Sequence, residues 1–233
     1  MSDKYYMEHS ASESDWLNWF IRNEKNQYKG TQTTIDLVVL KFIDQQLCVL
    51  MTQRRTHPFK NQWALPGSYL HDDEEPEDTI QRIFSEKIGQ IYTKQNSYLM
   101  QLETYAARNR DPRGRVVSTA YIVYTHQNFK KNDNLAWKPL IETGQQPNLA
   151  FDHADILFDA YLRTKDQFTW QPNSLYSLGD SGGFSLGEIV KLKAYLFQQD
   201  YREINRANLR KKLLPFLEDS GQKEKISFYK VKS

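Results

Sequence analysis

Cysteine is nearly absent from this sequence, because Cys48 is the only one among 233 residues. A single cysteine excludes a disulfide within the chain and suits a reducing compartment. Long apolar runs are absent too: none reaches the roughly 18 residues of a membrane-spanning helix, so we expect no membrane partner. Residues 1–16 lack the basic-then-apolar layout of a secretory signal. These absences predict a cytoplasmic protein, with Cys48 as a buried, inert thiol.

A strong excess of either charge is also missing, because the net charge is only +2. The charge is nevertheless unevenly placed. From Ser185 onward the chain carries 11 Lys and Arg against 6 Asp and Glu, whereas residues 1–184 carry 20 against 23. A basic C-terminal segment on a mildly acidic body favours a polyanionic partner. An ordinary solvated surface is the alternative explanation.

Apolar residues are plentiful enough to build a core, at 39% of the chain, with aromatics at 13%. β-branched and apolar runs predict strands, and the spacing of apolar residues after residue 152 predicts a helix. Strands that alternate with helices predict an α/β (α+β) sandwich. The expected strands are 33–42, 47–52, 98–107, 116–125 and 135–140, and the expected helix is 152–163.

The first 30 residues are expected to be a leader that precedes this sandwich. Residues 1–11 are predicted to be disordered, and residues 14–26 to form a short amphipathic helix that carries Trp16, Trp19 and Phe20. The helix either packs on its own domain or forms a dimer contact.

Two polar residues interrupt otherwise apolar segments. Asp36 lies inside the first strand, where it is either a paired buried carboxylate or part of a subunit contact. His153 has no partner histidine at a metal-binding spacing, so we expect it to cap a helix or to hydrogen-bond.

Arginines gather at two loops. Arg54 and Arg55 end the second strand, and an adjacent pair at a strand exit either holds a phosphate or is solvated. The loop 108–115, RNRDPRGR, carries four more arginines between two strands. Such a loop is either simply exposed or a clamp for a phosphorylated or sugar-bearing ligand.

Residues 63–90, WALPGSYLHDDEEPEDTIQRIFSEKIGQ, predict a turn, an acidic loop and a helix. Pro76 suits the first helical position, where its missing N–H costs nothing. Apolar residues at helical spacing form one stripe, and Gly89 suits the helix end because it tolerates a left-handed conformation. The members of the stripe are Ile80, Ile83, Phe84 and Ile88.

This segment resembles the Nudix box, G-x5-E-x7-R-E-U-x-E-E-x-G-U, without insertion. Glu74, Arg82 and Glu86 match the pattern. Ser68 replaces the first glycine, Ile83 the first helix glutamate and Lys87 the last. In that family the helix carboxylates bind Mg²⁺. The resemblance therefore implies a vestigial box with no catalytic residue and no metal cofactor.

The C-terminal part follows a different pattern after a predicted linker at 166–184, which has room for a short packed turn around Trp170 and Leu175. Ser185 and Glu188 predict a capping box that opens one helix, and Asn205 caps a second, basic helix from 206 to about 217. Pro215 is expected to bend or shorten the last turn of that second helix. A strand at 226–231 with lysines beside it follows. Residues 185–233 thus have the layout of a small winged helix-turn-helix domain. Leu209, Leu213, Phe216 and Leu217 are expected on the buried face of the second helix.

The two halves together resemble the Nudix-related transcriptional regulators over residues 31–233. The resemblance implies a Nudix-like domain at 31–165 that senses an ADP-ribose-like nucleotide or a sugar, and a homodimer that binds operator DNA and controls NAD metabolism. The residues implied to face the effector are Arg54, Arg55, Arg110, Asp111, Arg113 and Arg115. Those implied to face DNA are Arg206, Asn208, Arg210, Lys211, Lys212, Lys223 and Lys225.

Two other functions are open at this point. The chain could be an active Nudix hydrolase that cleaves ADP-ribose or a related nucleoside diphosphate derivative, with Glu74 and Glu86 as surviving ligands for Mg²⁺. Glu77, Asp78 or Glu103 would then supply the missing carboxylates. A protein-interaction module is the third reading, because many helix-turn-helix domains bind only other proteins.

Overall fold

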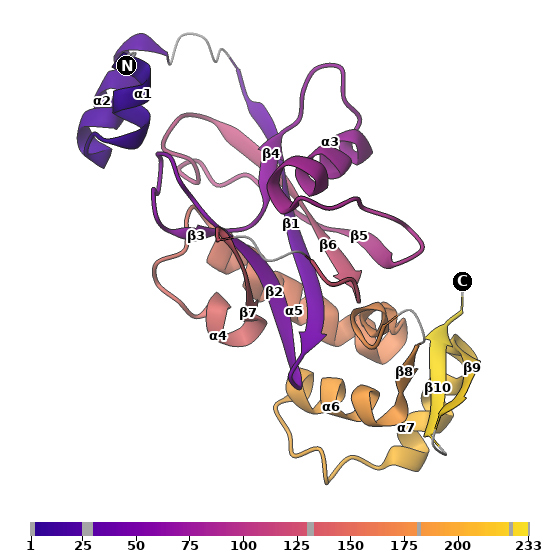
Figure 1. The fold of residues 1–233 in the computed structure, drawn as a ribbon. Coiled ribbons are helices and arrows are strands. Elements are labelled where there is room, and N and C mark those ends of the chain that lie inside the picture. Colours follow the sequence, from indigo (N-terminus) through magenta and orange to yellow (C-terminus); the bar gives the residue numbers. More distant parts are fainter. Residues whose placement is uncertain (1–2, 25–29, 130–132, 181–182, 224–225, 233) are drawn as a thin grey trace.

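The computed structural model describes residues 3–24, 30–129, 133–180, 183–223 and 226–232. Along the chain it forms a pair of short helices, a central sheet with helices on both faces, and a small C-terminal domain at the opposite end from the first helices (Figure 1). In the described ranges, no helix is both long and apolar enough to cross a membrane.

The central sheet has seven strands in the order β3-β2-β1-β6-β5, with β4 paired to β1 and β7 paired to β2. β1 and β6 are parallel, and the other pairs are antiparallel. The strands are β1 (Gln32–Ile43), β2 (Gln46–Gln53), β3 (Trp63–Ala64), β4 (Gly67–Tyr69), β5 (Ser97–Tyr105), β6 (Val116–Thr125) and β7 (Leu135–Pro139). The five predicted strands are therefore confirmed to within a few residues at each end.

Alternation along β1 divides the core into two layers, because successive strand side chains point to opposite faces. Ile35, Leu37 and Val39 pack in the cluster that contains the box helix. Val38 and Leu40 pack in the cluster that contains the second large helix. The helices of the sandwich are α3 (Pro76–Arg82), η2 (Ile83–Ile88), α4 (Leu140–Gly144) and α5 (His153–Trp170). The predicted α/β sandwich is confirmed.

The box helix begins and ends where the sequence predicts. Pro76 occupies the first turn, and Glu75 and Asp78 form a capping box. The helix widens to π geometry at Ile83–Ile88 and ends at Gly89, whose φ of 73° is left-handed. The predicted apolar stripe is buried, with each of its four members at most 2% exposed.

The C-terminal domain combines two helices with a three-stranded sheet in the order β8-β10-β9. Its elements are β8 (Phe184–Ser185), α6 (Leu186–Phe197), α7 (Arg206–Leu213), η4 (Leu214–Phe216), β9 (Leu217–Lys223) and β10 (Ile226–Val231). The short turn η3 (Asn173–Ser177) precedes them and packs mainly on β6 and α5. Ser185 and Glu188 form the expected capping box, and Asn205 accepts from the Asn208 N–H. This is the predicted winged helix-turn-helix layout.

The structure refines several of the predicted elements. α7 ends at Leu213, because the chain tightens into the η4 turn around Pro215, as the expected shortening of the last turn requires. The prediction that Phe216 is buried is wrong, because it is 37% exposed. α5 continues into the predicted linker as far as Trp170, which is exposed, and the expected packed turn forms around Leu175, which is fully buried. Residues 3–9 are helical, so the predicted disorder there is wrong.

The leader forms α1 (Asp3–His9) and α2 (Glu13–Asn23), which lie together at one end of the molecule (Figure 1). Trp16 and Phe20 are buried, and Trp16 stacks on His57 of the central domain with ring centroids 5.7 Å apart. The leader thus packs on its own domain, as one of the two sequence alternatives expects.

The central and C-terminal domains share one continuous core, because buried side chains of both belong to a single cluster. Two tyrosines join them through hydrogen bonds. Tyr161 of α5 donates to the Leu196 carbonyl of α6 at 2.7 Å, and the Ile141 N–H donates to the Tyr195 hydroxyl at 3.1 Å. The winged helix is therefore docked on the sheet instead of tethered to it.

Candidate functional site

Arg82 holds the box loop against the box helix. Its Nε and Nη2 donate to the two oxygens of Glu74 at 2.6 and 2.7 Å. Its Nη1 donates to the Ser68 hydroxyl and its Nη2 to the Tyr69 carbonyl, both at 2.8 Å. The hydrogen bonds from Arg82 lower the pKa of Glu74 to about 2. Glu74 is thus committed to an internal ion pair.

The remaining box residues do not fit a Mg²⁺ cluster. Ile83 is 1% exposed and packs in the core, so this position offers no oxygen ligand. Glu86 is a single exposed carboxylate 4.0 Å from the Arg82 guanidinium. Lys87 lines the cavity described next, and its ammonium group has no lone pair with which to bind a metal. Among the residues that the structure describes, no group of three or more His, Cys, Asp or Glu side chains is placed to hold a metal.

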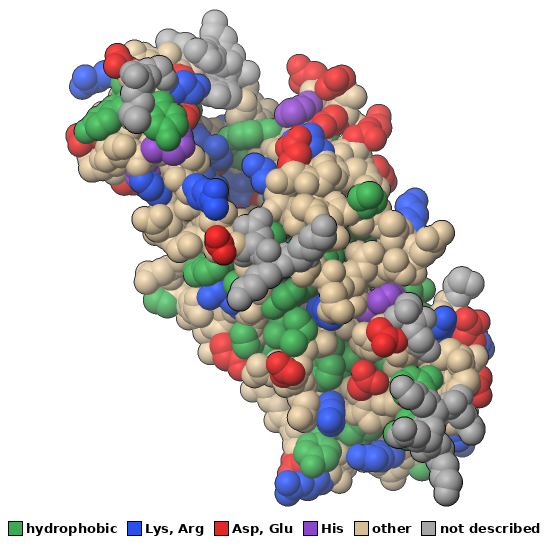
Figure 2. Space-filling view, in the orientation of Figure 1, with side chains coloured by type: hydrophobic (Ala, Val, Ile, Leu, Met, Phe, Trp, Pro, Cys, Tyr) green, Lys and Arg blue, Asp and Glu red, His purple; other side chains and the backbone are tan. Residues whose placement is uncertain are grey.

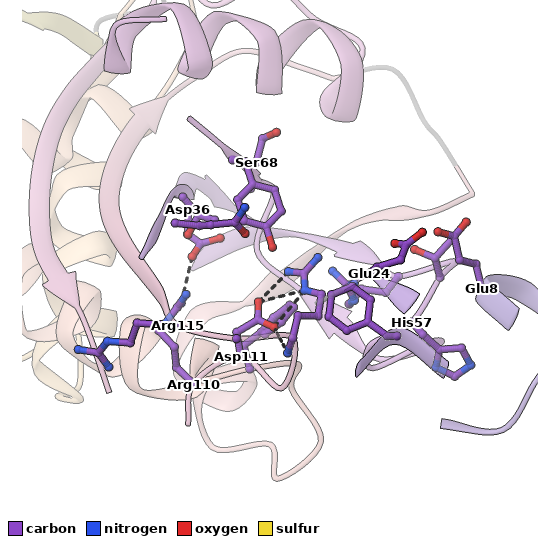
Figure 3. Close-up of a pocket in the computed structure, with 18 of the residues that line it drawn as sticks. Glu8, Glu24, Asp36, His57, Ser68, Arg110, Asp111 and Arg115 are labelled. Atoms are coloured by element: carbon purple, nitrogen blue, oxygen red, sulfur yellow. Dashed lines mark hydrogen bonds and ion pairs between the residues drawn. The ribbon is translucent and has the colours of Figure 1, made fainter. Parts of the chain in front are cut away.

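A cavity of about 360 Å³ lies beside the box, between the sheet and the leader. Its walls come from β1, β4, the loop after β2, the loop 110–115, the segment before α5 and both leader helices. Figure 3 shows residues from these distant segments around one space, with Asp36 and Ser68 on one side and Glu8 and Glu24 on the other.

The floor of this cavity is a buried ionic network around Asp36. The Ser118 hydroxyl donates to Asp36 at 2.6 Å, and the Arg110 guanidinium lies 3.3 Å away. Arg110 also donates twice to Asp152, at 2.7 and 2.8 Å. Asp36 is therefore the paired buried carboxylate among the two sequence alternatives. Arg110 is only 7% exposed and ties the loop to the start of α5.

His153 completes the floor. The Leu65 N–H donates to its Nδ1 at 2.9 Å, and its Nε2 lies 3.6 Å from Asp36. Burial lowers the pKa of His153, which favours a neutral ring that can accept at Nδ1. The predicted hydrogen-bonding role is confirmed.

Arginine and aromatic side chains alternate on the wall above the floor. The Arg113 guanidinium lies 5.2 Å from the Tyr69 ring centre and 5.8 Å from that of Phe151. Arg54 lies 4.9 Å from the same Phe151 ring centre. Burial, followed by repulsion from Arg113, lowers the pKa of Arg54 to about 10. These cations are oriented by rings and by Asp111, which binds Arg113 at 2.7 Å.

The cavity gathers most of the residues that the sequence singled out. Arg54, Arg110, Asp111, Arg113 and Arg115 line it. Arg55 is not among the lining residues. Sequence reasoning missed Tyr69, Phe151, Lys87 and the leader. Phe151 had one signal, its place directly before the expected helix, where its φ of 57° turns the chain sharply.

The second candidate site is the outer face of α7. Leu209 and Leu213 are buried against α6, so the residues between them point outward. The exposed residues include all five that the sequence predicted on this helix: Arg206, Asn208, Arg210, Lys211 and Lys212. Figure 2 shows Lys and Arg side chains at the lower end of the molecule, over this domain. The side chain of Lys223 and the whole of Lys225 lie outside the described residues.

The family follows from a direct match. Residues 31–160 match the NUDIX domain. The chain belongs to the Nudix family. Among curated Nudix relatives, the ADPR responsive transcriptional repressor NtrR of Acinetobacter baylyi is 30% identical over 159 residues. The matched stretch covers 65% of this chain and 62% of that repressor.

Solved structures extend the likeness across both domains. A MutT/nudix family protein from Enterococcus faecalis is 29% identical with a TM-score of 0.71, and the match covers 99% of this chain and 98% of that one. NrtR of Shewanella oneidensis is 28% identical with a TM-score of 0.74, covering 86% and 94%. NrtR has also been solved with a 27mer DNA, and its Nudix domain with ADP ribose (32% identity, TM-score 0.52, covering 66% and 99%).

Proposed function

We propose that this chain is a transcriptional repressor that binds operator DNA through α7 and the hairpin of β9 and β10, and that responds to ADP-ribose or a related nucleotide in the Nudix cavity. The observation that carries the proposal is a single continuous core that joins two candidate sites. A cavity rich in arginines and aromatic rings lies in the Nudix domain, and a basic exposed helix lies on a domain that shares its core.

The cavity chemistry suits a nucleoside diphosphate. Arg54 and Arg113 offer planar guanidinium groups that match phosphate oxygens. The Tyr69 ring lines the cavity, and a purine base can stack on it. Lys87 adds a cation where the family pattern has a metal-binding glutamate. We infer that this ammonium neutralises part of the diphosphate charge in place of Mg²⁺.

The DNA-binding half follows the physics of winged helices. A helix fits the major groove, and Arg, Lys and Asn side chains supply phosphate and base-edge hydrogen bonds. A homodimer would place two such helices on a near-palindromic operator. A gel-shift titration with DNA from upstream of the chain's own gene tests this half. We expect specific retardation at modest salt, and equal affinity for unrelated DNA would contradict it.

Hydrolysis of ADP-ribose is the second candidate, because Glu86 is exposed beside the Arg82–Glu74 pair. We propose that it does not occur, since the box lacks two of its three helix carboxylates. The test is ADP-ribose cleavage with Mg²⁺, compared between the wild type and Glu86→Gln. Turnover in the wild type that collapses in the variant would establish an enzyme, and no turnover in either supports a sensor.

A further inference from the structure

The two leader helices form a wall of the Nudix cavity. Lys4 and Glu8 of α1, Trp16 and Phe20 of α2, and Glu24 after it all line the space. The leader precedes the matched Nudix region, which begins at residue 31. The cavity therefore has a wall that the Nudix fold itself does not supply.

A clamp fixes this wall in position. Glu13 at the start of α2 contacts His57 Nδ1 at 2.5 Å and accepts from the Phe59 N–H at 3.1 Å. The other ring nitrogen of His57 lies 3.1 Å from the Ala11 carbonyl. Lys60 donates to the carbonyl of His9. Four contacts thus tie both leader helices to the turn 57–60.

The clamped turn also positions Arg54, one of the cations that line the cavity. The Pro58 carbonyl accepts from Arg54 Nε at 2.6 Å, and Arg54 stacks on Phe151. Contacts therefore link the leader, through residues 57–60, to Arg54, which the proposed function assigns to phosphate binding.

The leader brings two carboxylates, those of Glu8 and Glu24, and the ammonium of Lys4 to the cavity. Glu24 is held by Lys4 at 2.9 Å, and its side chain is only 13% exposed. Glu8 lines the same side, and Figure 3 places both carboxylates away from Asp36 and Arg110. Arg110 and Arg115 lie at one end of the cavity, and the Glu8 and Glu24 carboxylates lie at the other (Figure 3). This arrangement fits a ligand that has phosphates at one end and hydrogen-bond donors at the other.

We propose that the leader is the specificity wall of the effector site, and that Glu24, held in place by the Glu13 clamp, accepts hydrogen bonds from the sugar hydroxyls beyond the diphosphate. This inference rests on the proposed function and assigns recognition of the terminal sugar to the leader. A nucleoside diphosphate that carries a terminal sugar is then preferred over the same nucleoside diphosphate without one.

The test is calorimetric titration of the full chain with ADP-ribose and with ADP, which lacks the terminal sugar. Glu24→Gln removes the anionic acceptor, and Glu13→Ala releases the clamp. We expect each variant to bind ADP-ribose at least about tenfold more weakly than the wild type, as fits the loss of a charge-assisted hydrogen bond. The affinity of Glu24→Gln for ADP should be unchanged.

Asp3→Asn is the matched control, because it removes an exposed α1 carboxylate that does not line the cavity. Thermal unfolding of each variant checks that the fold is intact. Tight ADP-ribose binding by the wild type with equal affinity in Glu24→Gln would overturn this inference alone. Wild-type chain that binds neither ligand would overturn the proposed effector class and this inference with it.

Discussion

Gly67 lies against the buried carboxylate of Asp36, which joins Ser118 and Arg110 in the cavity floor. A Cβ at position 67 would collide with Asp36 Oδ1 and lie 2.9 Å from the Ile35 carbonyl. Asp36 cannot move aside without losing its partners. We expect Gly67→Ala to lower the free energy of unfolding by about 2 kcal/mol, the usual range for overpacking.

Urea unfolding measures this loss. Gly114→Ala is the matched control, because a Cβ there meets nothing within 4 Å. We expect the control to change stability by less than about 0.5 kcal/mol. Equal stability of the two variants would mean that Asp36 and its partners can shift to accommodate the added Cβ at little cost in free energy.

Glu74 makes a pH-dependent contribution whose sign follows from its lowered pKa. The group titrates at about 2 in the folded chain against an ordinary value of 4.5. Its ion pair with Arg82 therefore stabilises the fold above pH 4.5, and this stabilisation is lost as the pH falls toward 2. We expect Glu74→Gln to be less stable than the wild type at pH 7, with a gap that narrows below pH 4.5.

Urea titrations at several pH values follow that gap. Asp72→Asn, an exposed acid in the same loop, is the control and should show little difference at any pH. A gap that stays constant down to the acid limit of folding would show that Glu74 contributes through packing and not through its charge.

A substitution at Lys87 tests the inference that its ammonium neutralises diphosphate charge in place of Mg²⁺. We expect ADP-ribose to bind with the same affinity in EDTA and in Mg²⁺, and Lys87→Gln to bind about tenfold more weakly, since one cation near the phosphates is lost. Lys94→Gln, an exposed lysine that does not line the cavity, is the control. Binding that requires Mg²⁺ would contradict the role given to Lys87.

Individual site residues could be predicted only in part. The arginine-rich composition of the RDPRGR loop was enough to predict a ligand site there. Five of the six expected ligand residues line one cavity. Sequence could not choose between roles for Asp36, because its partner Arg110 lies 74 positions away and only the folded sheet brings them together. Phe151 and Glu24 reach the cavity for the same reason, through long-range packing that has no local signature.

At the scale of elements, α7 carries the proposed phosphate contacts. Lys211 lies on its exposed face, opposite the buried Leu209 and Leu213. We expect Lys211→Ala to weaken DNA binding about equally on different sequences, and to reduce the slope of log affinity against log salt by about 1. Anisotropy titrations from low to moderate salt measure both quantities.

Lys94→Ala serves as the control here as well, because it removes the same charge far along the chain from α7. An unchanged salt slope in Lys211→Ala would place the DNA elsewhere on the molecule.

Helix ends could be predicted where a capping residue, a proline or a glycine marks them. They could not be predicted where the composition of a segment resembles that of a loop but the segment packs in the core. Pro76, Gly89, Ser185 and Asn205 each mark a helix end that the structure confirms. The Ser, Gly and Asn content of 166–184 predicts a linker with a short packed turn around Trp170 and Leu175. The turn at Leu175 forms, but α5 also extends to Trp170 and buries Phe168. The structure of that segment is therefore determined by tertiary packing and not by its local composition.

At the scale of the whole molecule, α5 connects the two sites. Asp152 and His153 at its start belong to the cavity floor. Tyr161 on the same helix donates to α6. A ligand that rearranges the floor therefore acts on a helix that the winged domain rests upon. Energetic coupling between two such sites is commonly worth 1 to 3 kcal/mol, or roughly 5- to 150-fold in affinity.

The most direct test of the account is the DNA affinity of the full chain, measured by anisotropy on its own upstream DNA with and without saturating ADP-ribose. The account predicts specific binding and a change in affinity of at least about fivefold on addition of ADP-ribose, with ADP-ribose recovered uncleaved. Specific DNA binding that is identical with and without bound ADP-ribose would contradict it.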